Sequence, residues 1–148
     1  MAVLPHFKLT SRSLRIFVVE DHEDTATYLC LYLELLGHST ACAGTMAQAL
    51  EKLPRAGYDL ILCDIQLPDG NGWDLLRQIN AQLPLPTYAV AMSAWNSKDA
   101  HAISEAVGFH HHLDKPIKPL ALDAVLHEAA NALSDCPRSR AMLSHRRY

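Results

Sequence analysis

Short apolar runs alternate along the chain with stretches whose apolar residues recur at helical spacing. The compact apolar runs predict buried strands. They lie at residues 15–19, 38–43, 59–63, 87–92 and 109–113. The stretches between and after them predict helices at residues 25–36, 45–53, 73–82, 96–107 and 119–133. Five strands that alternate with five helices favour an α/β fold, in which one parallel sheet is covered by helices on both faces.

Capping residues mark the ends of these elements. Asp24 is expected to be the N-cap of the first helix and Gly37 to end it. Thr45 and Gln48 fit a capping box for the second helix. Pro54 is expected to close that helix after residue 53, because proline disrupts helical hydrogen bonding.

Polar residues follow the predicted strands at the points where four of them end. In open α/β sheets, ligands bind beyond the carboxyl ends of the strands. The residues at these positions are Glu20, Asp21, Asp64, Ser93 and Lys115. Each of them alone is readily explained as a cap, a turn residue or a surface charge. Together they place three carboxylates, one hydroxyl and one ammonium at the same edge of the sheet.

Three neighbouring carboxylates repel one another and raise one another's pKa unless a cation joins them. Oxygen-only ligands suit Mg²⁺, or the similar Mn²⁺, and such an ion keeps waters or takes an anionic substrate. A phosphoryl group is an anion of this kind, and Lys115 and Ser93 could hold its remaining oxygens.

Length and charge limit the classes of protein that fit. The chain has 148 residues, which suits one ordinary domain. We expect this domain at residues 14–134, between basic and solvated tails at 1–13 and 135–148 that are without fixed structure. Residues 16–136 hold all 16 acidic residues and only six basic ones, so direct DNA binding by the domain is not expected. The last 14 residues are too few for a helix-turn-helix with its own core.

Other features favour a cytoplasmic protein. No apolar run reaches the roughly 18 residues that a membrane helix requires, and the first residues do not resemble a secretion signal. The four cysteines are widely spaced, three of them in apolar surroundings, which favours free thiols over disulfides or a zinc site.

The signals at the strand ends resemble the receiver domain of two-component response regulators. These signals are Glu-Asp after the first strand, Asp-Ile-x-Leu-Pro-Asp-x-x-Gly after the third, Ser-Ala after the fourth and Lys-Pro after the fifth. The resemblance covers about residues 14–134. It implies a flavodoxin-like, doubly wound sheet with strand order 2-1-3-4-5.

The resemblance also implies a role for each residue. Asp64 matches the aspartate that accepts a phosphoryl group, and Glu20 and Asp21 match the acidic pair that holds Mg²⁺ with it. The backbone carbonyl of Gln66 would be a further metal ligand. Ser93 matches the hydroxyl that contacts the phosphoryl group, and Lys115 matches the lysine that neutralises it. The Lys115–Pro116 peptide is expected to be cis.

In receivers, phosphorylation switches a protein-binding surface, and the resemblance makes Ser93 part of this switch. Three further positions are expected to tune it. Receivers commonly carry Tyr or Phe three residues before the lysine, where this chain has His112. A histidine could still turn inward, and its protonation would couple the switch to pH. Gln66 and Trp95 flank the path of the attacking water and are expected to modulate the lifetime of the acyl phosphate.

Two further features have simpler explanations. The run His110–His111–His112 invites a metal site, but alternation along a strand sends His111 to the face opposite its neighbours. Trp73 is interpreted as a local packing residue.

The sequence therefore predicts a signalling receiver rather than an enzyme. It would take a phosphoryl group from a histidine kinase or a histidine phosphotransfer protein and act on a protein target through the face of helix four, strand five and helix five. The first hypothesis is a stand-alone receiver, and a close second is the receiver segment of a larger hybrid histidine kinase. A pseudo-receiver that is never phosphorylated is disfavoured by the intact acidic set. A phosphate-ester hydrolase would usually have a second aspartate two residues after the nucleophile, where this chain has Gln66.

Overall fold

The computed structural model describes residues 12–82, 87–94 and 98–134. Within them, five parallel strands form one sheet in the order β2-β1-β3-β6-β7. The strands are β1 Arg15–Val19, β2 Ser39–Ala43, β3 Leu60–Asp64, β6 Tyr88–Ser93 and β7 His111–Asp114. Counted among the sheet strands alone, this is the predicted order 2-1-3-4-5, so the expectation of a doubly wound α/β fold is confirmed.

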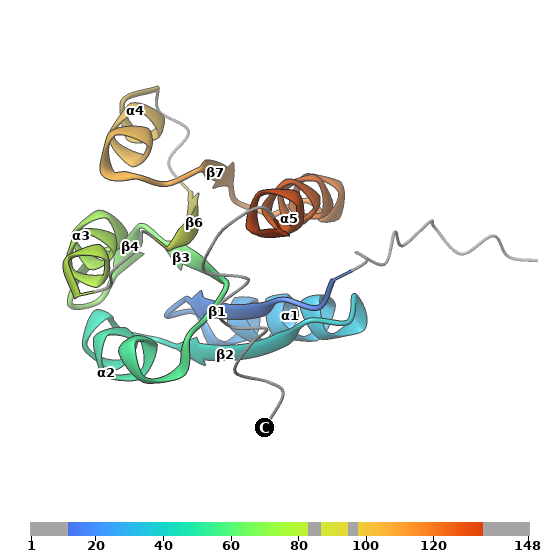
Figure 1. The fold of residues 1–148 in the computed structure, drawn as a ribbon. Helices are drawn as coiled ribbons and strands as arrows, with labels where there is room; N and C mark the ends of the chain where they lie inside the picture. Colours follow the sequence, from blue (N-terminus) through green and yellow to red (C-terminus); the bar gives the residue numbers. More distant parts are fainter. Residues whose placement is uncertain (1–11, 83–86, 95–97, 135–148) are drawn as a thin grey trace, which may run out of the picture.

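Helices cover both faces of the sheet (Figure 1). One face carries α1 Glu23–Leu35 and α5 Pro119–Ser134, and the other carries α2 Met46–Ala56, α3 Gly72–Gln82 and α4 Lys98–Val107. Alternate residues of each central strand enter the two cores. In β1, for example, Ile16 and Val18 pack toward α1 and α5, whereas Phe17 and Val19 pack toward α2 and α3. Burial on both faces explains why these strands are almost wholly apolar in sequence.

The first helix begins two residues before the predicted span, and its N-cap is His22 rather than Asp24. The His22 side chain accepts a hydrogen bond from the Thr25 amide through Nδ1 at 3.4 Å, so Asp24 lies inside the first turn. At this position its carboxylate interacts favourably with the positive end of the helix dipole. Gly37 follows the helix at a φ of +95°, as a residue that terminates a helix in the left-handed region.

The second helix is longer than predicted. Thr45 is its N-cap, and the Thr45 hydroxyl accepts a hydrogen bond from the Gln48 amide at 3.1 Å. The helix continues through residue 54 to Ala56, so Pro54 does not close it. It ends instead at Gly57, which has a φ of +60°. The missing amide of a proline costs only one hydrogen bond near the end of a helix, whereas a left-handed glycine turns the chain away.

Other boundaries differ by a few residues. β3 and β6 each extend one residue further than predicted, to Asp64 and Ser93, because both pair with neighbouring strands at these positions. β7 begins at His111, since Phe109 donates its amide to the Ser104 carbonyl and so closes α4. The predicted loop before α3 contains a small antiparallel pair, β4 Gln66–Leu67 and β5 Gly70–Asn71.

Several expectations fall outside the described residues. They include the tails apart from residues 12 and 13, the start of the fourth helix at Asn96, the fourth cysteine Cys136, and Trp95. Cys30, Cys42 and Cys63 are free thiols, as predicted, but burial was expected for them and only Cys63 of these three is buried, whereas Cys42 is exposed. No helix in the described ranges is both long and apolar enough to cross a membrane.

Candidate functional site

The polar residues that the sequence singled out gather at the carboxyl edge of the sheet. Glu20 directly follows β1, Asp64 ends β3, Ser93 ends β6 and Lys115 directly follows β7. Glu20, Asp64 and Ser93 are buried, with at most 4% of each residue exposed. Parallel strands deliver their carboxyl ends to one edge, which is why residues from four distant segments meet here.

The amine of Lys115 joins two of the carboxylates. Its Nζ donates to Glu20 Oε2 at 2.6 Å and to Asp64 Oδ2 at 2.8 Å. The Lys115–Pro116 peptide that follows β7 is cis, as expected. Two buried carboxylates thus share one cation, an arrangement that offsets part of their mutual repulsion.

The second oxygen of each carboxylate accepts a backbone amide hydrogen. Glu20 Oε1 accepts from the His22 amide at 3.1 Å, and Asp64 Oδ1 accepts from the Gln66 amide at 2.9 Å. Both side chains are therefore held at two points, which fixes their direction. The side chain of Gln66 itself is exposed.

Burial and the contact between lysine and carboxylate act in opposite directions on the pKa values of Glu20 and Lys115. Burial raises the pKa of Glu20, and the Asp64 charge raises it further, although the Lys115 hydrogen bond works the other way. Burial alone would lower the pKa of Lys115, but its bonds to Asp64 and Glu20 outweigh this effect and raise it. The raised pKa keeps the lysine protonated, and its single positive charge faces three carboxyl groups, an excess of acidic over basic groups.

That excess fits a divalent cation. Glu20, Asp21 and Asp64 each offer a carboxylate oxygen, and these oxygens lie within 4.8 Å of one another. Asp21 is exposed, so the cluster opens to solvent on one side. An open, oxygen-only donor set suits Mg²⁺, which retains several waters.

Ser93 lies beside this cluster on the neighbouring strand. β3 pairs with β6 so that Asp64 lies opposite Met92, one residue before Ser93. The Ser93 carbonyl accepts a hydrogen bond from the Lys115 amide at 2.8 Å, which ties the ends of β6 and β7 together. The Ser93 hydroxyl lies 3.2 Å from Nε2 of His112.

The ring of His112 lies between two buried hydroxyls. Its Nε2 faces Ser93, and its Nδ1 lies 2.9 Å from Oγ of Ser104 on α4. The Ser104 hydroxyl in turn accepts a hydrogen bond from Nε1 of Trp73 at 2.8 Å. Burial, and then the neighbouring His101, lower the pKa of His112, which favours the neutral ring.

Sequence reasoning missed this chain of contacts from Ser93 to Trp73. Trp73 packs against the core of α2 and α3, as predicted, but it also carries a specific hydrogen bond. A signal for Ser104 was present, since Ala100 and Ser104 lie four residues apart on the buried face of α4. A serine on such a face needs a hydrogen-bond partner.

The three consecutive histidines face different surroundings. His111 lies 2.8 Å from Glu128 on α5 and 3.2 Å from the Tyr88 hydroxyl, on the sheet face opposite to that of His112. His110 stacks on the Tyr88 ring and accepts the Ala89 amide hydrogen through Nδ1. The expected separation of His111 from His112 is confirmed, but His110 precedes β7 and shares the Tyr88 ring with His111, so it does not lie opposite to His111 as alternation predicted.

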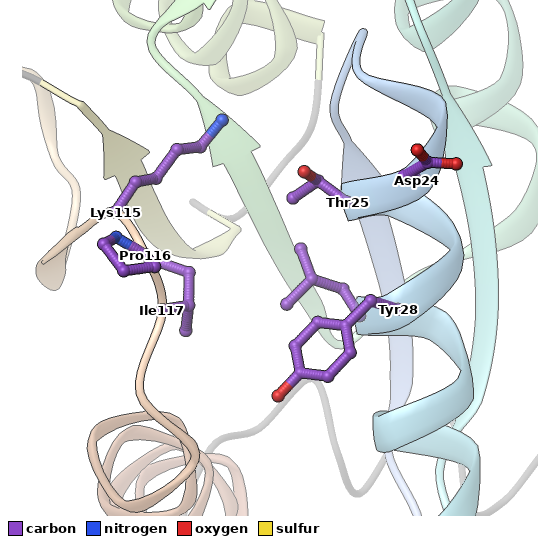
Figure 2. A pocket seen from close by; sticks show the side chains of 7 residues that line it. Asp24, Thr25, Tyr28, Lys115, Pro116 and Ile117 are labelled. Atoms are coloured by element: carbon purple, nitrogen blue, oxygen red, sulfur yellow. The ribbon is translucent and has the colours of Figure 1, made fainter.

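A groove of about 650 Å³ lies next to the acidic cluster, between α1 and the segment that follows β7. Figure 2 shows Thr25 and Tyr28 on one side of it and Lys115 and Ile117 on the other. Tyr28 is 49% exposed, and Leu31 and Leu35 continue an exposed apolar stripe along the same helix.

A family comparison identifies this arrangement. The sequence model of one protein family, the response regulator receiver domain, matches residues 16–127 of this chain. The chain belongs to the receiver domain family. Receiver domains are signalling modules of two-component systems, found in response regulators and hybrid kinases, and the family interacts with histidine kinases and phosphotransfer proteins.

Curated relatives include proteins of both kinds. The chain is 38% identical over 117 residues to the aerobic respiration control sensor protein ArcB of Escherichia coli, and 31% identical over 109 residues to the sensory/regulatory protein RpfC of Xanthomonas campestris. These matches cover 77% and 72% of this receiver but only 15% of each relative. The DNA-binding transcriptional activator DevR/DosR of Mycobacterium tuberculosis is 28% identical over 138 residues, which are 90% of this chain and 58% of that protein.

Solved structures share the fold. A CheY-like receiver domain protein from Methanospirillum hungatei aligns with a TM-score of 0.75 at 25% identity, covering 82% of this chain and 96% of that one. A two-component response regulator from Clostridium difficile aligns with a TM-score of 0.76 at 26% identity, covering 80% and 97%. The flavodoxin-like receiver fold predicted from the sequence is thus confirmed.

Proposed function

We propose that this receiver accepts a phosphoryl group on Asp64 from a phosphohistidine of a histidine kinase or a histidine phosphotransfer protein. The observation that carries the proposal is the position of Asp64, which shares the Lys115 amine with Glu20 at the carboxyl edge of the sheet. This arrangement supplies a nucleophilic carboxylate, a fixed cation and an acidic cluster in one place. The receiver unit in this proposal is residues 14–134.

The transfer is a displacement at phosphorus. An Asp64 oxygen forms the new P–O bond as the P–N bond of the phosphohistidine breaks, and the departing imidazole takes up a proton. Lys115 neutralises charge on the phosphoryl oxygens, and the Ser93 hydroxyl donates to one of them. The Gln66 amide, which donates to Asp64 Oδ1, keeps the carboxylate oriented during the attack.

Glu20, Asp21 and Asp64, with the backbone carbonyl of Gln66, would hold Mg²⁺ or Mn²⁺. When bound, this ion stabilises negative charge on the transferring group. The donor set supports this assignment, because the three carboxylate oxygens lie within 4.8 Å of one another and burial leaves Glu20 and Asp64 little access to water.

The groove beside Lys115 supports a docking site for the phosphodonor protein. It opens directly next to the lysine that contacts Asp64, and Tyr28, Leu31 and Leu35 extend it as an apolar surface on α1. Exposed apolar stripes of this kind mark protein-protein contacts. The downstream target would bind the face formed by α4, β7 and α5, which His112 links to Ser93.

A hydrolase and a pseudo-receiver are the alternative functions. Gln66 occupies the position at which a hydrolase would carry its acid/base carboxylate, and its exposed amide cannot transfer protons in that way. The pseudo-receiver is disfavoured by the bond from Lys115 to Asp64, which links the two residues that phosphotransfer would need.

Intact-mass measurement after treatment with acetyl phosphate and Mg²⁺ tests the proposal. We expect the mass of one phosphoryl group to be added to the wild type and to Asp74→Asn, a control carboxylate on the surface of α3, and none to Asp64→Asn. Chelation of the divalent ion should prevent the addition. An unmodified wild type would indicate a pseudo-receiver, and continuous release of phosphate would indicate a hydrolase.

A second experiment tests the docking site. Tyr28→Ala should slow transfer from a phosphorylated histidine phosphotransfer domain at least several-fold but leave phosphorylation by acetyl phosphate unchanged. Equal slowing of both reactions would place the effect of Tyr28 in the chemistry and not in docking.

A further inference from the structure

A second group of metal-ligating side chains lies on the α4 side of the sheet. His101 comes from α4, and His112 and Asp114 come from β7. Positions 112 and 114 lie on the same face of the strand because side chains alternate along it. His101 and Asp114 are 42% and 43% exposed, so the group is accessible from solvent.

The three side chains are close enough to share one ion. The rings of His101 and His112 stack with centroids 4.0 Å apart and an angle of 15° between their planes. His101 Nε2 lies 3.1 Å from Asp114 Oδ1. One ligand atom from each residue lies within 4.8 Å of those of the other two, and rotation of the stacked rings is needed to turn their nitrogens toward a common cation.

We propose that His101, His112 and Asp114 bind a divalent ion of the zinc type. Two imidazoles and one carboxylate favour Zn²⁺ over Mg²⁺, which prefers oxygen ligands alone. Three protein ligands leave a fourth tetrahedral position for water, in keeping with the solvent exposure of the group. The site is separate from the acidic cluster at Asp64, with which it shares no residue.

The surroundings of His112 provide an outer shell for this ion. Both ring nitrogens lie against hydroxyls, Nε2 against Ser93 and Nδ1 against Ser104. An ion on either nitrogen displaces one of these hydroxyls, while the other continues to orient the ring, as outer-shell partners of ligating histidines do. A metal-nitrogen bond replaces the hydrogen bond that the displaced hydroxyl made to that nitrogen, and this hydroxyl must then find another partner.

Binding would tie α4 to β7 and alter the contact between His112 and Ser93. If the proposed function holds, zinc therefore acts on the contact between His112 and Ser93, which also responds to the phosphoryl group. The metal site itself does not depend on that function, since it rests only on the geometry of the three ligands.

Calorimetric titration with Zn²⁺, in a buffer with millimolar Mg²⁺ to occupy the acidic cluster, tests the site. We expect one zinc ion to bind the full chain, and His101→Ala and Asp114→Asn each to weaken binding at least tenfold. These side chains are half exposed, so both variants should keep the wild-type circular dichroism spectrum. His111→Ala is the matched control, because it removes a histidine of the same strand from the opposite face, and it should bind zinc as the wild type does.

The remaining outcomes contradict the proposal. Wild-type affinity in both His101→Ala and Asp114→Asn would show that zinc binds elsewhere, and so would an equal loss in His111→Ala. Asp64→Asn should retain zinc binding even though it abolishes phosphorylation; loss of zinc in that variant would place the ion in the acidic cluster. Failure of the metal site and failure of the proposed function therefore give different results.

Discussion

Nε2 of His112 lies 3.2 Å from the hydroxyl of Ser93, and through this contact the carboxyl edge of the sheet is joined to α4. The opposite ring nitrogen contacts Ser104, whose hydroxyl accepts the Trp73 indole N–H. A displacement of Ser93 therefore changes the surroundings of a tryptophan on α3. In receivers with Tyr or Phe at the position of His112, no ring nitrogens are present to make both contacts.

Trp73 should report phosphorylation by its fluorescence. In a Trp95→Phe background, acetyl phosphate and Mg²⁺ should change the emission of Trp73, because the Ser93 hydroxyl turns to the phosphoryl group and the hydrogen bonds beyond it rearrange. Adding His112→Phe should remove most of this change but leave the phosphorylated mass intact. An unchanged response in the His112→Phe protein would show that the signal reaches Trp73 by another route.

Lys115→Met should destabilise the fold strongly. The substitution keeps the length of the side chain but leaves Glu20 and Asp64 buried without their shared cation, a loss of about 3 kcal/mol in the free energy of unfolding. Millimolar Mg²⁺ should restore part of this stability. Urea unfolding with and without Mg²⁺ measures both effects.

Lys118→Met provides the control for that experiment, since it removes an exposed lysine three residues away. It should change the free energy of unfolding by less than about 0.5 kcal/mol. Similar losses in the two variants would mean that net charge, and not the contact with the two carboxylates, accounts for the effect.

Gly72→Ala should displace the backbone at Asp64. A Cβ at residue 72 would lie 2.6 Å from the Asp64 carbonyl oxygen and 3.0 Å from the Cys63 sulfur, both of them in the core of the sheet. We expect a loss of about 1–3 kcal/mol in the free energy of unfolding and slower phosphorylation, because the end of β3 must shift.

At Gly44, by contrast, an added Cβ meets only ordinary contacts, the nearest at 3.8 Å from the Glu20 carbonyl oxygen. Gly44→Ala should therefore be nearly neutral in urea unfolding. A Gly72→Ala protein as stable as Gly44→Ala would contradict the close approach of α3 to β3.

His38 should make the fold less stable at acidic pH. It is buried and accepts the Leu14 amide hydrogen through Nδ1 at 3.0 Å, and burial lowers its pKa although Asp59 acts in the opposite direction. The unfolded chain, with a histidine pKa of about 6.5, then binds a proton more readily than the folded one. The stabilisation is complete above that pH and is lost as the pH falls from about 6.5 toward the folded pKa; each unit of lowering corresponds to about 1.4 kcal/mol.

His38→Gln offers an amide oxygen that can accept the same hydrogen bond but does not titrate. The difference in the free energy of unfolding between wild type and variant should therefore shift in favour of the variant between pH 7 and pH 5. A difference that stays constant over this range would show that His38 has the same pKa in the folded and unfolded chains.

Local patterns were sufficient for elements whose ends depend on nearby residues. Thr45 caps α2 as the spacing to Gln48 predicted, because an N-cap is a contact within one turn. Local patterns gave the wrong N-cap for α1, because His22 lies close enough to cap the helix in place of Asp24. They also gave the wrong end for α2, because the helix continues past Pro54 and ends at the left-handed Gly57. The β4–β5 pair was missed because two-residue strands carry no periodic signal.

The sequence by itself determined the order of strands and helices and which chemical groups stand at the strand ends. Both follow from hydrophobic periodicity, and parallel strands necessarily bring those ends to one edge. Only the tertiary structure decided that Lys115 contacts Glu20 as well as Asp64, that His112 lies between Ser93 and Ser104, and that His101 joins His112 and Asp114. These contacts depend on how α4 packs against β7 and on which side chain fills the space between buried carboxylates. These contacts result from close packing between segments that are distant in the sequence, so no local pattern along the chain predicts any one of them.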